Sequence, residues 1–239
     1  MAGLVSDIGL KRALNEDCGS YFEGDNFRIY VVADGMGGHN AGEVASKMAA
    51  ERIVDYVKSN FSKIDEKDLI TVAIEEVNRE IFNFSMTNSK LNGMGTTVTA
   101  CLMTKNNIYV ANVGDSSCIG IKDGIIKKIT KDHSLVQELV DSGTISESEA
   151  VNHPKKNIIT RALGTSAVVS VDVFEVMNNE YEILLLCSDG LTNEVTKEEI
   201  LEIINNENSY DNMANKLVDM AKEKGGRDNI TVLLFGGEM

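Results

Sequence analysis

The sequence is poor in the residues that mark several common classes of functional site. Its three histidines, His39, His133 and His153, form neither a His-Glu-x-x-His motif nor the spacing of a zinc site. Its four cysteines are scattered without a Cys-x-x-Cys pair, and none is followed six positions later by the arginine of a cysteine-nucleophile phosphatase loop. A Walker phosphate loop is absent too. The sequence therefore argues against zinc and against a covalent cysteine mechanism, and it favours free, buried thiols in a reducing compartment.

Positive charge and long apolar runs are also scarce. The chain has 23 basic and 37 acidic residues, a net charge of -14, which repels nucleic acid and anionic lipid, so we expect neither as a partner. No apolar run approaches the roughly 20 residues that span a bilayer, and no N-terminal segment has the pattern of a signal peptide. We therefore expect a cytoplasmic protein. An acidic protein can still handle phosphate if divalent cations reverse the local field.

What the chain does have is many short apolar runs separated by turn signals, which predict a sizeable β core. The runs occupy residues 3–8, 18–22, 27–33, 94–104, 107–113, 117–121, 125–129, 168–176, 181–188 and 229–236. Hairpin-like spacing dominates residues 94–130, and few βαβ alternations occur, so antiparallel sheets are favoured. With 239 residues and 43% hydrophobic content, the chain can bury a substantial core. We predict one α+β layered sandwich domain over residues 1–239.

Two long stretches have helical periodicity instead. Asn40 followed by Glu43 resembles a capping box, and the apolar residues after it predict an amphipathic helix to about residue 58. A second helix follows almost directly, with one apolar face formed by Ile70, Ala73, Ile74, Val77, Ile81 and Phe84. The short connection between them indicates an antiparallel pair.

Shorter helices are predicted later in the chain. Helix-start signatures occur at Ser134, Ser146 and Thr196, and Gly225-Gly226 ends a further helix. Residues 139–163 have only weak periodicity and contain the single proline, Pro154. We therefore expect a surface excursion there.

Four aspartates lie where an apolar run meets a turn. Asp34, Asp115 and Asp189 follow such runs, and Asp228 precedes one. A single Asp-Gly is more typical of a tight turn. Four aspartates at strand ends favour a common site instead, because antiparallel neighbours bring such ends together. A site made of carboxylates and carbonyls suits Mg²⁺ or Mn²⁺ better than zinc or copper. The sequence therefore predicts a hard-metal site at one end of the sheets.

Arg12 lies a short distance before two adjacent acids, Glu16 and Asp17. An arginine can bind two phosphate oxygens at once. Alone, it would be read as a solvated surface charge. Beside the acids it becomes a candidate phosphate-binding group.

Taken together, these segments resemble the metal-dependent serine/threonine protein phosphatases of the type 2C (PPM) family, in particular its compact bacterial members. The likeness spans nearly the whole chain. Its marks are Ser6 to Gly9, Arg12 to Asp17, Val32 to Ser46, Gly93 to Thr97, Val113 to Ser116, Thr130 to Ser134, His153-Pro154, Ile159 to Gly164, Ser188 to Leu191 and Gly226 to Thr231.

The resemblance implies a four-layer α-β-β-α sandwich, with two antiparallel sheets flanked by helices and two Mn²⁺ or Mg²⁺ ions at one end. By this analogy Asp34 bridges the two ions, and the Gly35 carbonyl completes one coordination sphere. Asp189 and Asp228 hold the other ion, and Glu16 acts through water. Asp115 together with Asp189 matches the third metal site of bacterial members.

The same analogy assigns the catalytic groups. Arg12 would bind the phosphoryl group, and Asp17 would orient or deprotonate the water between the metals. His39 is a candidate general acid for the leaving alkoxide, because its intrinsic pKa is suitable. It could equally cap the following helix, and water on a third metal could be the acid instead.

One position departs from the family pattern. The frequent Gly-Asp-Ser-Arg is Gly114-Asp115-Ser116-Ser117 here, so family details beside the third site do not transfer. Residues 142–161 correspond to the flap of bacterial members, which the resemblance links to substrate choice.

Our main hypothesis is therefore a phosphatase that acts on phosphoserine and phosphothreonine in proteins and depends on Mn²⁺ or Mg²⁺. The expected partners are phosphorylated proteins, substrates of a cognate Ser/Thr kinase, and the expected state is monomeric. One alternative is a catalytically silent phosphoprotein-binding module, which would tolerate loss of metal ligands. Another is a dedicated phosphatase of one regulator, such as an anti-anti-sigma factor.

Overall fold

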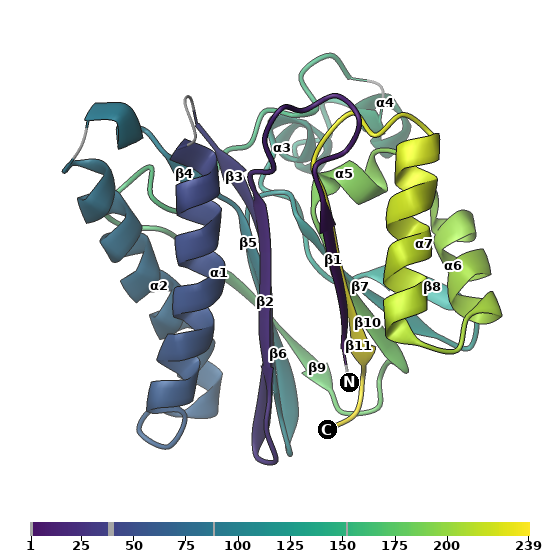
Figure 1. Ribbon diagram of the computed structural model, residues 1–239, viewed down its shortest axis with the longest axis horizontal. Helices are drawn as coiled ribbons and strands as arrows, with labels where there is room; N and C mark the ends of the chain where they lie inside the picture. The colour runs from purple at the N-terminus through teal and green to yellow at the C-terminus, as the bar shows by residue number, and fades with distance from the viewer. Residues whose placement is uncertain (1, 38–40, 88, 152) are drawn as a thin grey trace.

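The computed structural model describes residues 2–37, 41–87, 89–151 and 153–239. Two antiparallel sheets pack face to face, and helices cover the outer face of each, so the layers follow the order helix, sheet, sheet, helix (Figure 1). This confirms the predicted α+β sandwich of two antiparallel sheets flanked by helices.

The strands of each sheet come from distant parts of the chain. The five-stranded sheet has the order β1 (Gly3–Asp7), β11 (Ile230–Gly236), β10 (Ile183–Cys187), β7 (Ser117–Lys122) and β8 (Ile125–Lys128). The six-stranded sheet has the order β2 (Asp17–Glu23), β3 (Phe27–Met36), β5 (Val98–Thr104), β6 (Asn107–Val113) and β9 (Asp172–Met177), and β4 (Gly95–Thr96) pairs with β3.

Strand β3 shows why its central part is apolar throughout instead of alternating between apolar and polar residues. Ile29 and Val31 pack in the cluster under the helices, whereas Tyr30 and Val32 belong to the cluster between the two sheets. Both faces of the strand are therefore buried, and neither has room for polar residues. Between the sheets, the Tyr30 ring stacks on the Phe235 ring with centroids 3.6 Å apart.

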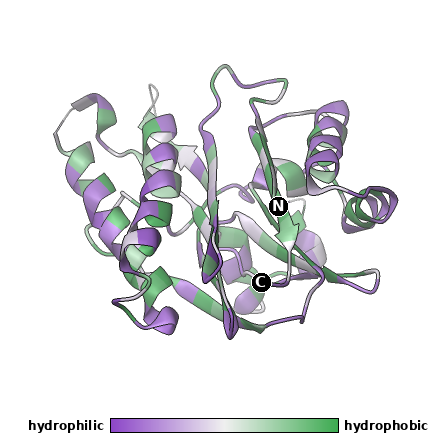
Figure 2. Cartoon of the chain, turned by 60° about the horizontal axis from the view of Figure 1, so that its bottom comes forward, coloured by the Kyte–Doolittle hydropathy of each residue, from purple (hydrophilic) through white to green (hydrophobic). Residues whose placement is uncertain are grey.

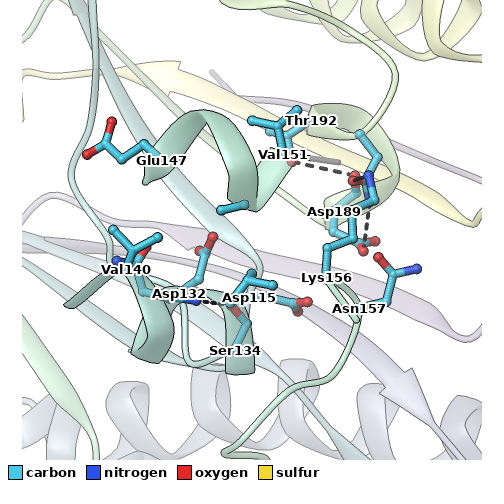
Figure 3. Close-up of a pocket in the computed structure, with 14 residues that line it drawn as sticks. Asp115, Asp132, Ser134, Val140, Glu147, Val151, Lys156, Asn157, Asp189 and Thr192 are labelled. Carbon is cyan, nitrogen blue, oxygen red and sulfur yellow. Dashed lines mark hydrogen bonds between the residues drawn. The ribbon is translucent and has the colours of Figure 1, made fainter. Parts of the chain in front are cut away.

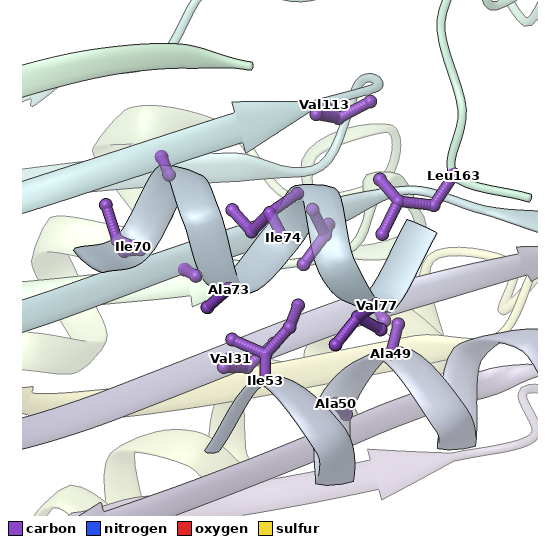
Figure 4. Close-up of a cluster of buried hydrophobic side chains, with 14 of the residues drawn as sticks. Val31, Ala49, Ala50, Ile53, Ile70, Ala73, Ile74, Val77, Val113 and Leu163 are labelled. Atoms are coloured by element: carbon purple, nitrogen blue, oxygen red, sulfur yellow. The ribbon is translucent and has the colours of Figure 1, made fainter. Parts of the chain in front are cut away.

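Helices α1 (Ala41–Asn60) and α2 (Glu66–Ser85) form the predicted antiparallel pair on the outside of the six-stranded sheet (Figure 1). Ala49 and Ile53 of α1 face Val31 of the sheet and Ala73 and Val77 of α2 (Figure 4). The small alanine side chains let the helices lie close to the strands. The predicted capping residue Asn40 lies outside the described residues.

Helices α6 (Lys197–Asn206) and α7 (Tyr210–Glu223) cover the five-stranded sheet, and their apolar sides pack on it in a separate cluster. Figure 2 shows hydrophilic and hydrophobic residues alternating along the helices, as expected for helices with one buried side. Thr196 forms a full capping box with Glu199, as predicted. The predicted stop is also confirmed, because α7 ends just before Gly225 and Gly226, which both have positive φ.

Three details of the prediction were wrong. Phe84 is 42% exposed, because the buried side of α2 continues from Ile81 to Ser85 and leaves position 84 outside it. The predicted strand 94–104 is divided into β4 and β5 at Thr97, whose side chain contacts Asp34. Asp189 opens a short helix, α5 (Asp189–Thr192), where the sequence indicated only a turn.

The predicted surface excursion exists and contains two short helices. Ser134 caps α3 (Leu135–Asp141), and α4 (Glu147–Val151) follows Ser146, whose hydroxyl accepts the Glu149 N–H at 3.3 Å. Neither helix has a fully buried residue. A 3-10 turn, η1 (Ser89–Leu91), follows α2. No helix in the described ranges is both long and apolar enough to span a membrane.

Candidate metal centre

The predicted carboxylates gather at the end of the sandwich opposite the two chain termini. The loop between β1 and β2, helix α5 and the flap region all lie at this end (Figure 1). Asp17 and Asp34 are directly opposite each other in the β2–β3 ladder. Asp189 follows β10 and Asp228 precedes β11, and these two strands are antiparallel neighbours. Two sheets thus each contribute a pair of aspartates to the same end.

Burial and mutual repulsion raise the pKa of most of these carboxyl groups. The pKa of Asp34 lies well above its usual value, because the group is buried and faces the charges of Asp17, Asp189, Asp115 and Asp228. Burial is also the main reason that the pKa reaches about 7 at Asp17 and Asp115 and about 6 at Asp189, and neighbouring aspartates add to the shift. Such a cluster has an excess of negative charge that bound cations would relieve.

Two of the carboxylates have a buried oxygen with no hydrogen-bond partner among the described residues: Oδ1 of Asp17 and Oδ1 of Asp189. A buried charged oxygen without a partner is costly, so these atoms fit the ligand or water contacts of a hard cation. Within the same residues, no three acidic, histidine or cysteine side chains are already arranged to hold a metal ion. The donor chemistry therefore fits Mg²⁺ or Mn²⁺, and the individual ligand assignments stay predictions.

A serine joins the two sheets at this site. Ser188 Oγ donates a hydrogen bond to Asp17 Oδ2 at 2.7 Å and accepts one from the Thr231 backbone N–H at 2.9 Å. Asp17 belongs to one sheet and Ser188 precedes α5 at the end of the other. This bond fixes one Asp17 oxygen and leaves the other, Oδ1, without a hydrogen-bond partner among the described residues.

Gly35 and Glu16 are held against the start of α1. The Gly35 N–H donates to the Glu16 carbonyl at 3.0 Å, and a Cβ at position 35 would overlap the carbonyl oxygen of Gly42. Only glycine therefore fits at this position. Burial raises the pKa of Glu16 despite the opposing charge of Arg12. The structure thus places Glu16 beside Gly35, and their roles as ligands stay predictions.

Arg12 lies at the same site. Its Nη2 donates to Asp228 Oδ2 at 2.7 Å, and its side chain is 47% exposed. A guanidinium that is half exposed and next to the carboxylates can still reach a phosphoryl group. His39, the candidate general acid, lies outside the described residues.

The sequence reasoning missed Asn229. Its Nδ2 donates to the carbonyls of Ile8 and Leu14 at 3.0 and 2.9 Å, and its Oδ1 accepts the Glu16 N–H at 2.8 Å. One buried side chain therefore holds the whole loop that carries Arg12 and Glu16. The only signal in the sequence was a polar residue between Asp228 and an apolar strand.

The turn that carries Asp115 is fixed by a buried histidine. The Gly114 backbone N–H donates to the ring Nδ1 of His133 at 3.1 Å, and the His133 backbone N–H donates to the Gly114 carbonyl at 2.9 Å. Ser117, which stands where the family often has arginine, has a buried Oγ with no hydrogen-bond partner among the described residues. Within the described residues, the side chain at this departure from the family pattern therefore forms no hydrogen bond next to Asp115.

Comparison with known proteins identifies the family. The family model for protein phosphatase 2C matches residues 11–234. The chain belongs to the protein phosphatase 2C family. It is therefore a metal-dependent phosphoprotein phosphatase, a phosphoric monoester hydrolase.

The phosphatase has similar relatives over nearly its full length. It is 45% identical to the serine/threonine phosphatase stp of Listeria monocytogenes serotype 4b (strain F2365) over 96% of this chain and 92% of the relative. It is 35% identical to the protein phosphatase PhpP of Streptococcus pneumoniae over 97% and 95% of the two chains.

Solved structures agree with this assignment. The serine/threonine phosphatase Stp1 of Staphylococcus aureus is 37% identical, with a TM-score of 0.88 over 98% of this chain and 94% of the other. PstP/Ppp of Mycobacterium tuberculosis is 36% identical, with a TM-score of 0.88 over 100% and 99% of the two chains. The family and the bacterial type inferred from the sequence are thus confirmed.

Proposed function

We propose that this phosphatase hydrolyses phosphoserine and phosphothreonine in proteins, with water as the nucleophile and two Mn²⁺ or Mg²⁺ ions as cofactors. The observation that carries the proposal is the position of Asp34. It lies directly opposite Asp17 in the β2–β3 ladder, partly exposed at the end of the sheets, and the charges of Asp17, Asp189, Asp115 and Asp228 help to raise its pKa. The relatives named serine/threonine phosphatases support the substrate class.

The chain offers a full set of oxygen ligands for the ions. Asp34, the Gly35 carbonyl, Asp189 and Asp228 would hold two of them, with Glu16 acting through water, and Asp115 with Asp189 would hold a third. When bound, these cations would neutralise charge on the phosphoryl oxygens and make a water more acidic.

The remaining groups would handle phosphate and protons. Arg12 would bind two phosphoryl oxygens and stabilise the charge that develops on them. Asp17 would accept the proton of the attacking water through Oδ1, because Ser188 already occupies Oδ2. His39 remains a candidate for protonating the serine or threonine leaving group.

The organisation around this site is part of the same proposal. Residues 1–239 would act as a single catalytic domain and as a monomer, and a cognate Ser/Thr kinase would supply the substrates. The predicted cytoplasmic location stays a prediction.

Two other readings make different predictions. A silent phosphoprotein-binding module would have no need of a cluster of carboxylates, yet Asp34, Asp189 and Asp228 are all present. A phosphatase dedicated to one regulator, such as an anti-anti-sigma factor, would have the same site. Phosphoproteomics of a strain that lacks the gene separates a dedicated phosphatase from a general one. Loss of a dedicated enzyme changes the phosphorylation of one protein, whereas loss of a general enzyme changes that of many.

The test is metal-dependent hydrolysis of p-nitrophenyl phosphate and of a phosphothreonine peptide. We expect activity only with added Mn²⁺ or Mg²⁺, and its loss in Asp34→Asn. Asp25→Asn is the matched control, because Asp25 is exposed in the turn at the other end of the same β2–β3 hairpin. Full activity in excess chelator, or in Asp34→Asn, would disprove the proposal.

A further inference from the structure

A pocket opens beside the carboxylate cluster, between the flap region and α5 (Figure 3). We call it the side pocket. It has a volume of about 330 Å³, and Asp115 and Asp189 are among the residues that line it. This volume lies at the small end of the range for ligand sites, about 300–1,000 Å³. The side pocket thus adjoins the proposed reaction centre and has room for one amino-acid side chain.

The wall of the side pocket formed by α3 and α4 is apolar. Val136 and Val140 lie one turn apart on α3, and Val151 at the end of α4 also lines it. These side chains are not buried by the rest of the protein, and Val151 is 65% exposed. A long aliphatic stem lying against them would remove this apolar surface from water.

The charge at the outer end of the side pocket is negative. Glu147 lies across the side pocket from Asp189 and Lys156, near Val140 (Figure 3), and forms no hydrogen bond or ion pair with any described residue. Two other charged residues of the lining already have partners. Lys128 Nζ donates to Asp132 Oδ1 at 2.6 Å, and Lys156 Nζ donates to Asn193 Oδ1 at 2.9 Å. Asn193 is neutral, so the Lys156 charge is not paired there and acts on Asp189, at the other side of the side pocket. Away from the carboxylate cluster, the Glu147 carboxylate is the lining charge that has no partner among the described residues.

We propose that the side pocket binds an arginine or lysine side chain that flanks the phosphorylated residue of the substrate, so that the phosphatase prefers basic phosphopeptides. Val136, Val140 and Val151 would contact the aliphatic stem, and Glu147 would pair with the cationic head at the rim. Both side chains combine an apolar stem with a charged head, which is the combination that the lining offers. The inference rests on the proposed function and adds a substrate preference to it.

The test compares phosphothreonine peptides that differ at one position. Arginine, alanine or glutamate is placed in turn at each position from three residues before to three residues after the phosphothreonine in a neutral peptide. We expect kcat/KM to be higher for arginine than for glutamate at one or two positions, by about three- to fivefold, the upper range for a partly exposed ion pair. In Glu147→Lys the ratio should fall to one or reverse. In Val140→Ser the advantage of arginine over alanine should shrink.

Each ratio is taken on one enzyme, so damage to the metal centre cancels. Glu75→Lys is the matched control, because Glu75 is exposed on α2 over the other sheet and makes the same change of net charge. It should keep the wild-type ratio. Equal kcat/KM for all peptides, or the same ratio in Glu147→Lys as in Glu75→Lys, would overturn the inference alone. Failure to hydrolyse any peptide or p-nitrophenyl phosphate would overturn the proposed function, and this inference with it.

Discussion

The Arg12 guanidinium and the Asp228 carboxylate form an ion pair, with Nη2 2.7 Å from Oδ2. The other Asp228 oxygen accepts the Asn229 backbone N–H at 2.8 Å. The carboxylate is thus held from both sides, and the predicted phosphate-binding cation is attached to a predicted metal ligand. In the proposed function, this contact would couple phosphate binding to metal binding.

We expect Arg12→Ala to weaken phosphate binding. The KM for a phosphopeptide should rise about tenfold at saturating Mn²⁺, because hydrogen bonds to charged groups contribute about 1.5–3 kcal/mol, and kcat should fall less. Arg12→Lys should give an intermediate value, since lysine cannot bind two oxygens in the same plane. Arg52→Ala, which removes an exposed arginine paired with Glu80 on the outer helices, serves as control. An unchanged KM in Arg12→Ala would rule out the phosphate-binding role.

Ser188→Ala should destabilise the fold. The change removes the hydrogen bond to Asp17 and leaves the buried Thr231 N–H without its side-chain acceptor. We expect the free energy of unfolding in urea to fall by about 1–3 kcal/mol. Ser59→Ala, at an exposed position of α1, should change it very little. Equal stability of the two variants would show that Ser188 does not join the sheets in the way described.

The ion pair between Asp7 and Lys222 predicts a pH-dependent effect. Burial raises the pKa of Asp7, but hydrogen bonds from Lys222 and Gly9 more than offset this, so its pKa lies below the usual value of 3.8. A lowered folded-state pKa stabilises the fold above the unfolded value, and this contribution disappears as pH falls through the folded value. Asp7→Asn should therefore lower the free energy of unfolding by about 1 kcal/mol at pH 7.

The difference between wild type and Asp7→Asn should then narrow between pH 5 and pH 3, as followed by urea unfolding at each pH. Asp25→Asn should show no such trend. A gap that stays constant down to pH 3 would mean that the charge of Asp7 does not stabilise the fold.

Much of the fold could be predicted from local pattern. Runs such as Ile29 to Ala33 are apolar throughout because both faces of β3 are buried, and the turn glycines mark where strands and helices end. The aspartates at strand ends could be identified in the sequence because each lies where an apolar run meets a turn. The face-to-face packing of two sheets came from the family resemblance, because local patterns do not specify which strands become neighbours.

The contacts that tune the site could not be predicted. Ser188 and Asp17 are 171 positions apart, and Asn229 binds a loop more than 200 positions earlier. A buried serine or asparagine gives no periodic signal, and its partners are known only once the sheets are packed. The division of the predicted strand 94–104 at Thr97 also depends on contacts with distant segments. The Thr97 hydroxyl accepts the Asp34 backbone N–H and forms a hydrogen bond with the Ser116 hydroxyl.

The central claim is that remote carboxylates form one site for hard divalent cations. Direct counting of bound Mn²⁺ by electron paramagnetic resonance, in wild type, Asp34→Asn and Asp25→Asn, tests it without depending on turnover. We expect at least two Mn²⁺ per wild-type chain, the same number in Asp25→Asn, and a loss of tight binding in Asp34→Asn. No binding in wild type, or equal binding in all three proteins, would contradict the account.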